Sequence, residues 1–179
     1  MALITYADKA TMNENSSVPT INKVRAADMN EIKSVVNANA RKDIITVTRA
    51  TDFTISQSDN YVTIPFDSSE SMGTGLTLSG GGVVVGSGIS RVKISSKICL
   101  PSSGMTAGSK NLVVRKNGNI VDRAWQYLEV RNSSMSTPVR MISVSAGDVL
   151  TLAYYGKQND KIAGSSVFTD FTVEAVEYE

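Results

Sequence analysis

The sequence predicts a mainly β protein in which an N-terminal arm and a short, coiled-coil-like helix precede an antiparallel jelly-roll β-sandwich. Apolar residues recur at helical spacing in only one stretch, which lies within residues 21–42. From residue 43 onward, apolar and polar residues alternate in about eight to ten short segments separated by turn residues, a pattern typical of a sandwich or jelly roll. We therefore expect an anchoring arm over residues 1–20, a helix for oligomerisation over residues 21–42 and a jelly-roll head over residues 43–179.

The arm and the helix are both expected to need a partner. Residues 1–20 are mostly small and polar and can bury little apolar area, so we expect them to dock onto another protein or a neighbouring subunit, or to fold back on their own head. The helix is too short to be stable alone, and its apolar stripe needs a partner surface. The stripe follows 3-4-3 spacing, at Met29, Ile32, Val36 and Asn39. We predict that this oligomer seam packs against sister copies with Asn39 fixing the register; the alternative is packing on its own β-domain.

The strongest local signal in the head is Asn117-Gly118, which predicts a tight hairpin between two apolar segments. Pro65 indicates the end or the edge of a strand. The three glycines at 80–82 predict a turn or bulge, because no Gly-Lys-Ser/Thr sequence follows them to bind phosphate. The other strands are expected near residues 46–48, 52–55, 61–66, 91–95, 112–114, 120–121, 124–130, 139–144, 149–155 and 168–178, with a turn at 146–148.

The composition argues against several classes of function. The net charge of +1 predicts no basic surface for nucleic acid. No run of about 18 apolar residues is present, so we expect no membrane insertion, and the first residues lack the basic-then-apolar pattern of a secretory signal. The sequence has no histidine, and its carboxylates follow neither a paired pattern nor a calcium-loop motif. We therefore expect no catalytic residue, no cofactor and no metal site.

The single cysteine and several aspartates are expected to be structural. Cys99 cannot form an intrachain disulfide, and its apolar neighbours in the sequence predict a small core residue. Four aspartates lie beside Gly, Ser or Asn, as turn-forming aspartates commonly do; they are Asp59, Asp67, Asp148 and Asp160.

The segment 124–130 and the residues that flank it carry the candidate interface or ligand face. Strand alternation puts one set of side chains on the same side: Arg123, Trp125, Tyr127 and Arg131. Trp, Tyr and Arg dominate interface hot spots, and Trp125 is the only tryptophan of the chain. Two interpretations stay open. Either this face is exposed and contacts another subunit or a ligand such as a sugar, or Trp125 fills the core of the sandwich.

Residues 21–37, which read INKVRAADMNEIKSVVN, resemble the N-terminal segment of many tailed-bacteriophage virion proteins. In those proteins a similar sequence segment precedes fibre or appendage domains. The resemblance implies a protein made in the bacterial cytoplasm and located in the virion. It also implies capsid or tail proteins as the partners of residues 1–20.

The head resembles a second family, the jelly rolls of the tumour-necrosis-factor and complement-head type. Residues 144–150 (VSAGDVL) are similar to a turn of that family, and residues 169–176 resemble its closing strand, whereas the glycine-rich residues 79–88 depart from its pattern. Members of the family form compact trimers, so the resemblance implies a homotrimer.

The leading interpretation is a structural virion protein. It would be a trimeric head fibre, tail fibre or capsid decoration that is anchored by its N-terminus and displays a β-sandwich knob for host attachment. The alternative is a receptor- or carbohydrate-binding module that recognises a host-surface glycan through Trp125 or a nearby loop. An enzyme such as a polysaccharide depolymerase is the third interpretation, and the lack of histidine and of paired acids disfavours it.

Overall fold

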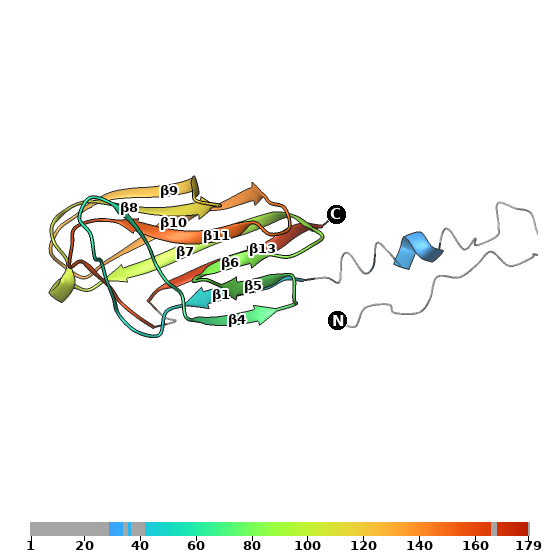
Figure 1. Ribbon diagram of the computed structural model, residues 1–179, viewed down its shortest axis with the longest axis horizontal. Helices are drawn as coiled ribbons and strands as arrows, with labels where there is room; N and C mark the ends of the chain where they lie inside the picture. The colour runs from blue at the N-terminus through green and yellow to red at the C-terminus, as the bar shows by residue number, and fades with distance from the viewer. Residues whose placement is uncertain (1–28, 34–35, 37–41, 166–167, 179) are drawn as a thin grey trace, which may run out of the picture. The chain divides into compact units, whose positions relative to one another are not determined.

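The computed structural model describes four stretches of the chain, residues 29–33, 36, 42–165 and 168–178 (Figure 1). The chain divides into two compact units, Met1–Lys42 and Asp43–Glu179, and each is considered by itself.

In the first unit, residues 29–33 and 36 are helical, in line with their apolar spacing. Met29 is half-buried, whereas Ile32 and Val36 are exposed. Asn39 lies outside the described residues, and the packing of the oligomer seam between copies stays a prediction. In the described stretches of the chain, no helix is long and apolar enough to cross a membrane.

The second unit, called the head below, is built from two antiparallel sheets, which confirms the predicted β-sandwich (Figure 1). The first sheet has five strands in the order β10–β7–β13–β1–β4, with bounds Ser133–Ser143, Ile89–Leu100, Asp170–Tyr178, Ile44–Thr48 and Ser68–Met72. The second sheet has six strands: β5–β6–β11–β8–β9 in order, with β3 also paired to β11. Their bounds are Leu76–Ser79, Gly82–Val85, Val149–Tyr155, Gly108–Lys116, Asn119–Leu128 and Tyr61–Thr63.

Two small elements complete the head. A two-stranded ribbon joins β2 (Phe53–Thr54) to β12 (Lys161–Ile162), and a single 3₁₀ turn, η2, spans Ser102–Gly104. The core lies between the two main sheets because the inward face of most strands is apolar. In β7 every second residue is buried from Val92 to Leu100, and β13 supplies Phe171, whose ring stacks on Phe66 with centroids 6.2 Å apart. Burial of each such apolar side chain contributes roughly 1.5–3 kcal/mol to the stability of the folded head.

The hairpin at Asn117-Gly118 is confirmed. Both residues have positive φ, 49° and 82°, as a two-residue turn between β8 and β9 requires. The Asn117 side chain also fastens this turn to the next one along the edge: its Oδ1 accepts a hydrogen bond from the Val149 N–H at 2.8 Å, and its Nδ2 donates to Asp148 Oδ1 at 2.6 Å. The predicted turn at 146–148 is present too, with Gly147 at φ 86°.

The glycine-rich segment is a turn between two strands, as expected. Gly80 and Gly81 have φ of 58° and 79° and connect β5 to β6. The sequence pattern does not reveal β4, because its five residues, Ser68–Met72, are all exposed and mostly polar. This strand exists through its pairing with β1, a long-range contact that no local periodicity reports.

Two expectations about individual positions are wrong. Cys99 is half-buried rather than a core residue, because it alternates with Ile98 and Leu100, whose side chains take the inward positions of β7. It lines an open hollow of about 420 Å³ on the outside of the sandwich. In addition, β9 ends at Leu128, so Arg131 lies in the following turn and not on the strand face with Trp125.

Candidate functional site

A row of side chains crosses four strands of the second sheet on its outward face. Trp125 of β9 pairs with Asn111 of β8, Asn111 pairs with Tyr155 of β11, and Tyr155 pairs with Tyr61 of β3. Directly paired residues project from the same face of a sheet. Since neighbouring strands are about 4.8 Å apart, Trp125 and Tyr155 lie about 10 Å apart across Asn111. Together with Tyr127, two residues along β9, these side chains are called the aromatic face.

The register shows that this face points away from the core. Leu112 and Val114 of β8 belong to the core cluster, and Val113 between them does not. Val113 pairs with Ala153 on one side and with Arg123 on the other. Both Val113 and Ala153 are nevertheless fully buried, so the longer side chains around them cover the middle of the sheet.

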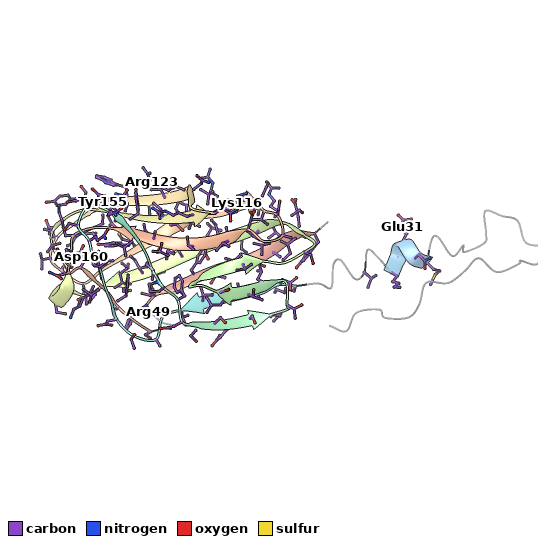
Figure 2. All side chains as sticks on the ribbon, viewed as in Figure 1. Glu31, Arg49, Lys116, Arg123, Tyr155 and Asp160 are labelled. Atoms are coloured by element: carbon purple, nitrogen blue, oxygen red, sulfur yellow. The ribbon has the colours of Figure 1, made fainter. Side chains whose placement is uncertain are left out.

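The two aromatic residues of β9 are open to solvent. Trp125 is 64% exposed and Tyr127 is 63% exposed, which excludes the interpretation in which Trp125 fills the core of its own sandwich. Arg123 shares their side of the strand and is exposed (Figure 2). The structure therefore brings together three of the four residues predicted for this face and leaves Arg131 outside it.

Two arginines border the aromatic face. The guanidinium carbon of Arg115 lies 5.1 Å from the centre of the Tyr61 ring, a cation–π arrangement. The Nε of Arg115 is buried and has no hydrogen-bond partner among the described residues. Within the same part of the chain, the ion pairs involve neither Arg115 nor Arg123. The face thus carries two positive charges that no carboxylate of the described head neutralises directly.

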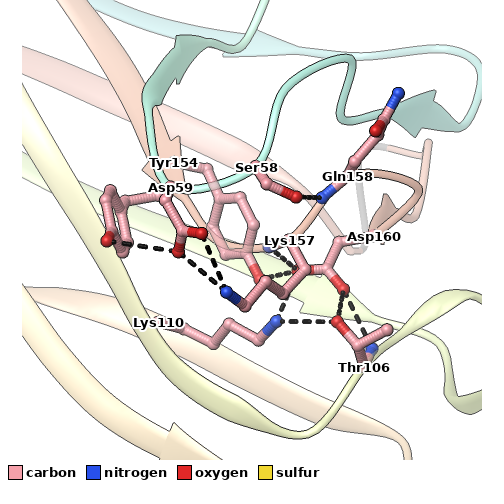
Figure 3. Close-up of polar contacts among 9 residues, drawn as sticks. Ser58, Asp59, Thr106, Lys110, Tyr154, Lys157, Gln158 and Asp160 are labelled. Atoms are coloured by element: carbon pink, nitrogen blue, oxygen red, sulfur yellow. Dashed lines mark hydrogen bonds and ion pairs between the residues drawn. The ribbon is translucent and has the colours of Figure 1, made fainter.

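The tyrosine end of the row is held by polar contacts. The rings of Tyr61 and Tyr155 are 5.3 Å apart and tilted by 52°. The Tyr155 hydroxyl donates to Asp59 Oδ1 at 3.3 Å, and Lys157 Nζ donates to both Asp59 oxygens at 2.9 and 2.8 Å (Figure 3). The hydrogen bond from Lys157 lowers the pKa of Asp59, and the same bond raises the pKa of Lys157. Both groups stay charged at neutral pH, so the contact that positions Tyr155 persists.

Below this end lies a buried polar cluster, called the Asp160 cluster: Thr106, Lys110, Tyr154, Lys157 and Asp160 (Figure 3). Lys110 and Asp160 are both fully buried, with Nζ 2.5 Å from Oδ2. Oδ2 also accepts the Tyr154 hydroxyl at 3.0 Å and the Lys157 N–H at 2.8 Å. Oδ1 accepts the N–H and the hydroxyl of Thr106 at 2.9 and 2.7 Å.

These five donors fix the charge state of Asp160. Burial alone would raise the pKa of the Asp160 carboxyl, but the hydrogen bonds from Lys110, Thr106 and Lys157 outweigh it and hold the pKa below its usual value. Burial raises the pKa of Tyr154, which stays protonated and donates its hydroxyl proton. A carboxylate whose oxygens are all occupied by donors is a poor base, so this cluster is a structural brace for the loop that carries Lys157.

Sequence reasoning missed this brace. The expected turn is present, since the Asp160 N–H donates to the Lys157 carbonyl at 3.1 Å, but Asp160 is above all the partner of a buried lysine. One signal was available: Lys110 lies in phase with Leu112 and Val114, and therefore on the inward face of β8. A lysine at an apolar position of a strand needs a buried acid. Among the described residues, no group of three or more Cys, Asp or Glu side chains is arranged to hold a metal ion.

Comparison with known proteins adds the fold family. No family model matches the chain, and no curated protein matches it. Two crystal structures of murine APRIL, at pH 8.5 and pH 8.0, are 14% and 15% identical in sequence, have TM-scores of 0.61 and 0.62, and match over 76% of this chain and 100% of theirs. The Eiger TNF of S. frugiperda is 10% identical, has a TM-score of 0.57, and matches over 75% of this chain and 91% of its own.

These likenesses show that the head has the tumour-necrosis-factor type of jelly-roll fold. That part of the resemblance seen in the sequence is confirmed, including its antiparallel sandwich. At such low identity the likeness concerns the fold alone. The virion origin implied by residues 21–37 has no counterpart among these structures and stays a prediction.

Proposed function

We propose that this chain is the displayed head of a tailed-bacteriophage appendage, a fibre or capsid decoration in which three copies assemble. Residues 1–20 would anchor it to capsid or tail proteins, and the helix would join the copies through Met29, Ile32, Val36 and Asn39. The jelly-roll head would then be presented to the host surface without catalysing a reaction. Three linked heads bind a repetitive surface more tightly than one, because the later contacts are intramolecular.

The observation that carries self-association is an exposed apolar strip along one edge of the head. The strip consists of Ile120 on β9 and of Val139 and Met141 on β10, and Val139 is 67% exposed. β9 and β10 end the two sheets and lie side by side, joined where Arg140 Nη1 donates to the Val121 carbonyl at 3.1 Å (Figure 1). Large apolar side chains gathered on one edge favour contact with another protein surface. The likeness to tumour-necrosis-factor folds makes a further copy of this chain the occupant that we propose.

The oligomeric state of the full chain tests the proposal. We expect size-exclusion chromatography with light scattering to give three times the protomer mass at micromolar concentration, and Val139→Ser to lower it. Val130→Ser is the matched control, because Val130 is 60% exposed but lies in the turn after β9, away from the strip. A monomeric wild type would contradict the assembly, and the same loss in both variants would contradict the role of the strip.

The proposed location of this protein in the virion needs a separate test. Antibodies against the head should label intact phage particles at a regular position, and a virion map should show density for three copies there. Particles that lack the protein while their lysate contains it would contradict the structural role.

The second candidate function is host-glycan recognition, and the exposure of Trp125 favours it. An aromatic ring presents an electron-rich face, which suits the C–H groups of a sugar ring. The aromatic face of the head offers three more aromatic rings beside Trp125. Release of reducing sugars from host cell wall would instead support the enzyme interpretation.

A further inference from the structure

We propose that the aromatic face binds an acidic saccharide, with sugar rings stacked on Trp125 and on Tyr155 and with the carboxylates of the saccharide paired to Arg123 and Arg115. This inference deepens the glycan-binding candidate and rests on it. It does not depend on the assembly of three copies, because every residue of the site belongs to one head.

The first argument is the spacing of the row. Trp125 and Tyr155 flank the smaller Asn111, so two ring surfaces stand on either side of a lower polar position. A chain of sugars laid across the strands can place one ring on each aromatic residue and turn a hydroxyl group toward the Asn111 amide. The amide has both donor and acceptor groups, and no hydrogen bond joins it to another described side chain.

The second argument is charge. Arg123 and Arg115 lie on the same outward face, both on the side of the row that leads to the Asn117-Gly118 hairpin. Neither has a carboxylate partner within the described head. Arg115 keeps a buried Nε–H without an acceptor. A buried donor left without a partner is unfavourable, and an incoming anionic oxygen would relieve this. A guanidinium pairs with a carboxylate through two parallel hydrogen bonds, so an acidic sugar fits better than a neutral one.

The third argument is that half of the site is already organised. Asp59 accepts the Tyr155 hydroxyl, Lys157 holds Asp59, and Asp160 holds the backbone of Lys157 (Figure 3). The charge of Asp59 is satisfied by Lys157 and does not repel an anion strongly. Because these contacts restrict Tyr155 before a ligand arrives, little conformational entropy is lost on binding.

Trp125 is the only tryptophan of the chain, so its fluorescence reports on the site directly. The full-length protein is titrated with a panel of acidic oligosaccharides, bearing uronic acid or sialic acid, and with the neutral methyl ester of each. We expect at least one acid to change the emission, with its ester binding at least about tenfold more weakly. Raising the salt concentration to about 1 M, where the Debye length is about 3 Å, should also weaken binding of the acidic oligosaccharide.

Variants then locate the binding, which is measured by calorimetry because one of them lacks the fluorophore. We expect Trp125→Ala and Arg123→Gln each to weaken binding of that acid at least about tenfold. Gln126→Ala is the matched control: Gln126 is also exposed on β9, but its side chain is on the opposite side of the strand, and its affinity should stay unchanged. All three variants change exposed residues, and an unaltered thermal transition verifies that each is folded.

Three results would overturn the inference: no acid bound better than its neutral ester, full affinity in Trp125→Ala, or an equal loss in Gln126→Ala. A host protein captured through the same face with no saccharide bound would also overturn it. The assembly proposal fails separately, by a monomer mass in light scattering. Val139→Ser, which is expected to lower the mass, should leave the affinity of each head for the oligosaccharide intact.

Discussion

The side chain of Lys110 is fully buried inside the β-sandwich, which is rare for lysine. Removing such a charge from water is unfavourable by several kcal/mol, and one close carboxylate offsets this only when its other lone pairs are satisfied too. Asp160 meets that condition through Thr106, Tyr154 and the Lys157 backbone. At the scale of single residues, the head is therefore braced by one polar cluster whose members depend on each other.

Removing one side chain of the Asp160 cluster should destabilise the head strongly. We expect Lys110→Met to lower the free energy of unfolding by about 3–5 kcal/mol, because it leaves the Asp160 charge buried without its ammonium partner. Urea denaturation measures the change. Lys116→Met is the control: Lys116 pairs with Asp148 at 3.4 Å near the surface, where an ion pair contributes about 0–1 kcal/mol. Equal effects of the two substitutions would contradict the brace.

The same cluster predicts a dependence on pH. The pKa of Asp160 is lowered in the folded state, so its ionised form stabilises the head above the unfolded pKa, near 4, and this contribution is lost as the pH falls toward the folded pKa. Asp160→Asn lacks the titrating group. We therefore expect the stability difference between wild type and Asp160→Asn to be constant from pH 7 to about pH 5 and to shrink below about pH 4. A difference that grows in acid would refute the assignment.

At the scale of elements, the turns set the register of the second sheet. Asn117 and Gly118 adopt positive φ, and the Asn117 side chain bonds to Val149 and Asp148 in the neighbouring turn. One residue thus links β8, β9 and β11, the three strands that carry Trp125, Asn111 and Tyr155. The aromatic face depends on this link, because a shift of one residue would turn those side chains to the opposite side.

Two substitutions in this turn distinguish the effect of backbone strain from the effect of the Asn117 side-chain hydrogen bonds. Gly118→Ala introduces a Cβ that meets no atom within 4 Å, so only the positive φ of 82° opposes it, at about 1–2 kcal/mol. Asn117→Ala has a similar backbone strain and also loses two side-chain hydrogen bonds, each contributing about 1 kcal/mol. We expect Asn117→Ala to be the more destabilising change in chemical denaturation, and the reverse order would contradict the link between turns.

Elements differ in how far the sequence predicts them. The hairpin at Asn117-Gly118 and the strand at 149–155 follow from turn chemistry and local alternation, and both are found where expected. Local patterns do not predict β4, because its five exposed and mostly polar residues form a strand only by pairing with β1. For the site, alternation groups Arg123, Trp125 and Tyr127, whereas Asn111, Tyr155 and Tyr61 join them through pairings between strands distant in the chain. Local sequence patterns contain no information about those pairings.

At the scale of the whole molecule, the proposed assembly and the stability of the head are coupled. Anything that binds the folded state and not the unfolded state raises the apparent stability by mass action. A self-associating head with an apolar strip at Val139 should therefore unfold at a temperature that rises with protomer concentration.

We expect the midpoint of thermal unfolding of the full chain to rise over a hundredfold increase in concentration, and the midpoint of Val139→Ser to rise less. Differential scanning calorimetry measures both, with Val130→Ser again as the control. Identical, concentration-independent midpoints in all three proteins would show that the copies do not stabilise one another.

The position of β1 has a mechanical consequence. This strand follows directly after residue 43, and it lies inside the first sheet, paired with β13 on one side and β4 on the other. Tension applied along the axis of β1 from that end would load both ladders in shear, so their hydrogen bonds would bear the force together. A strand on the rim of a sheet would instead unzip one bond at a time. A head tethered through β1 therefore withstands more pulling force before it unfolds than one tethered through a strand on the rim.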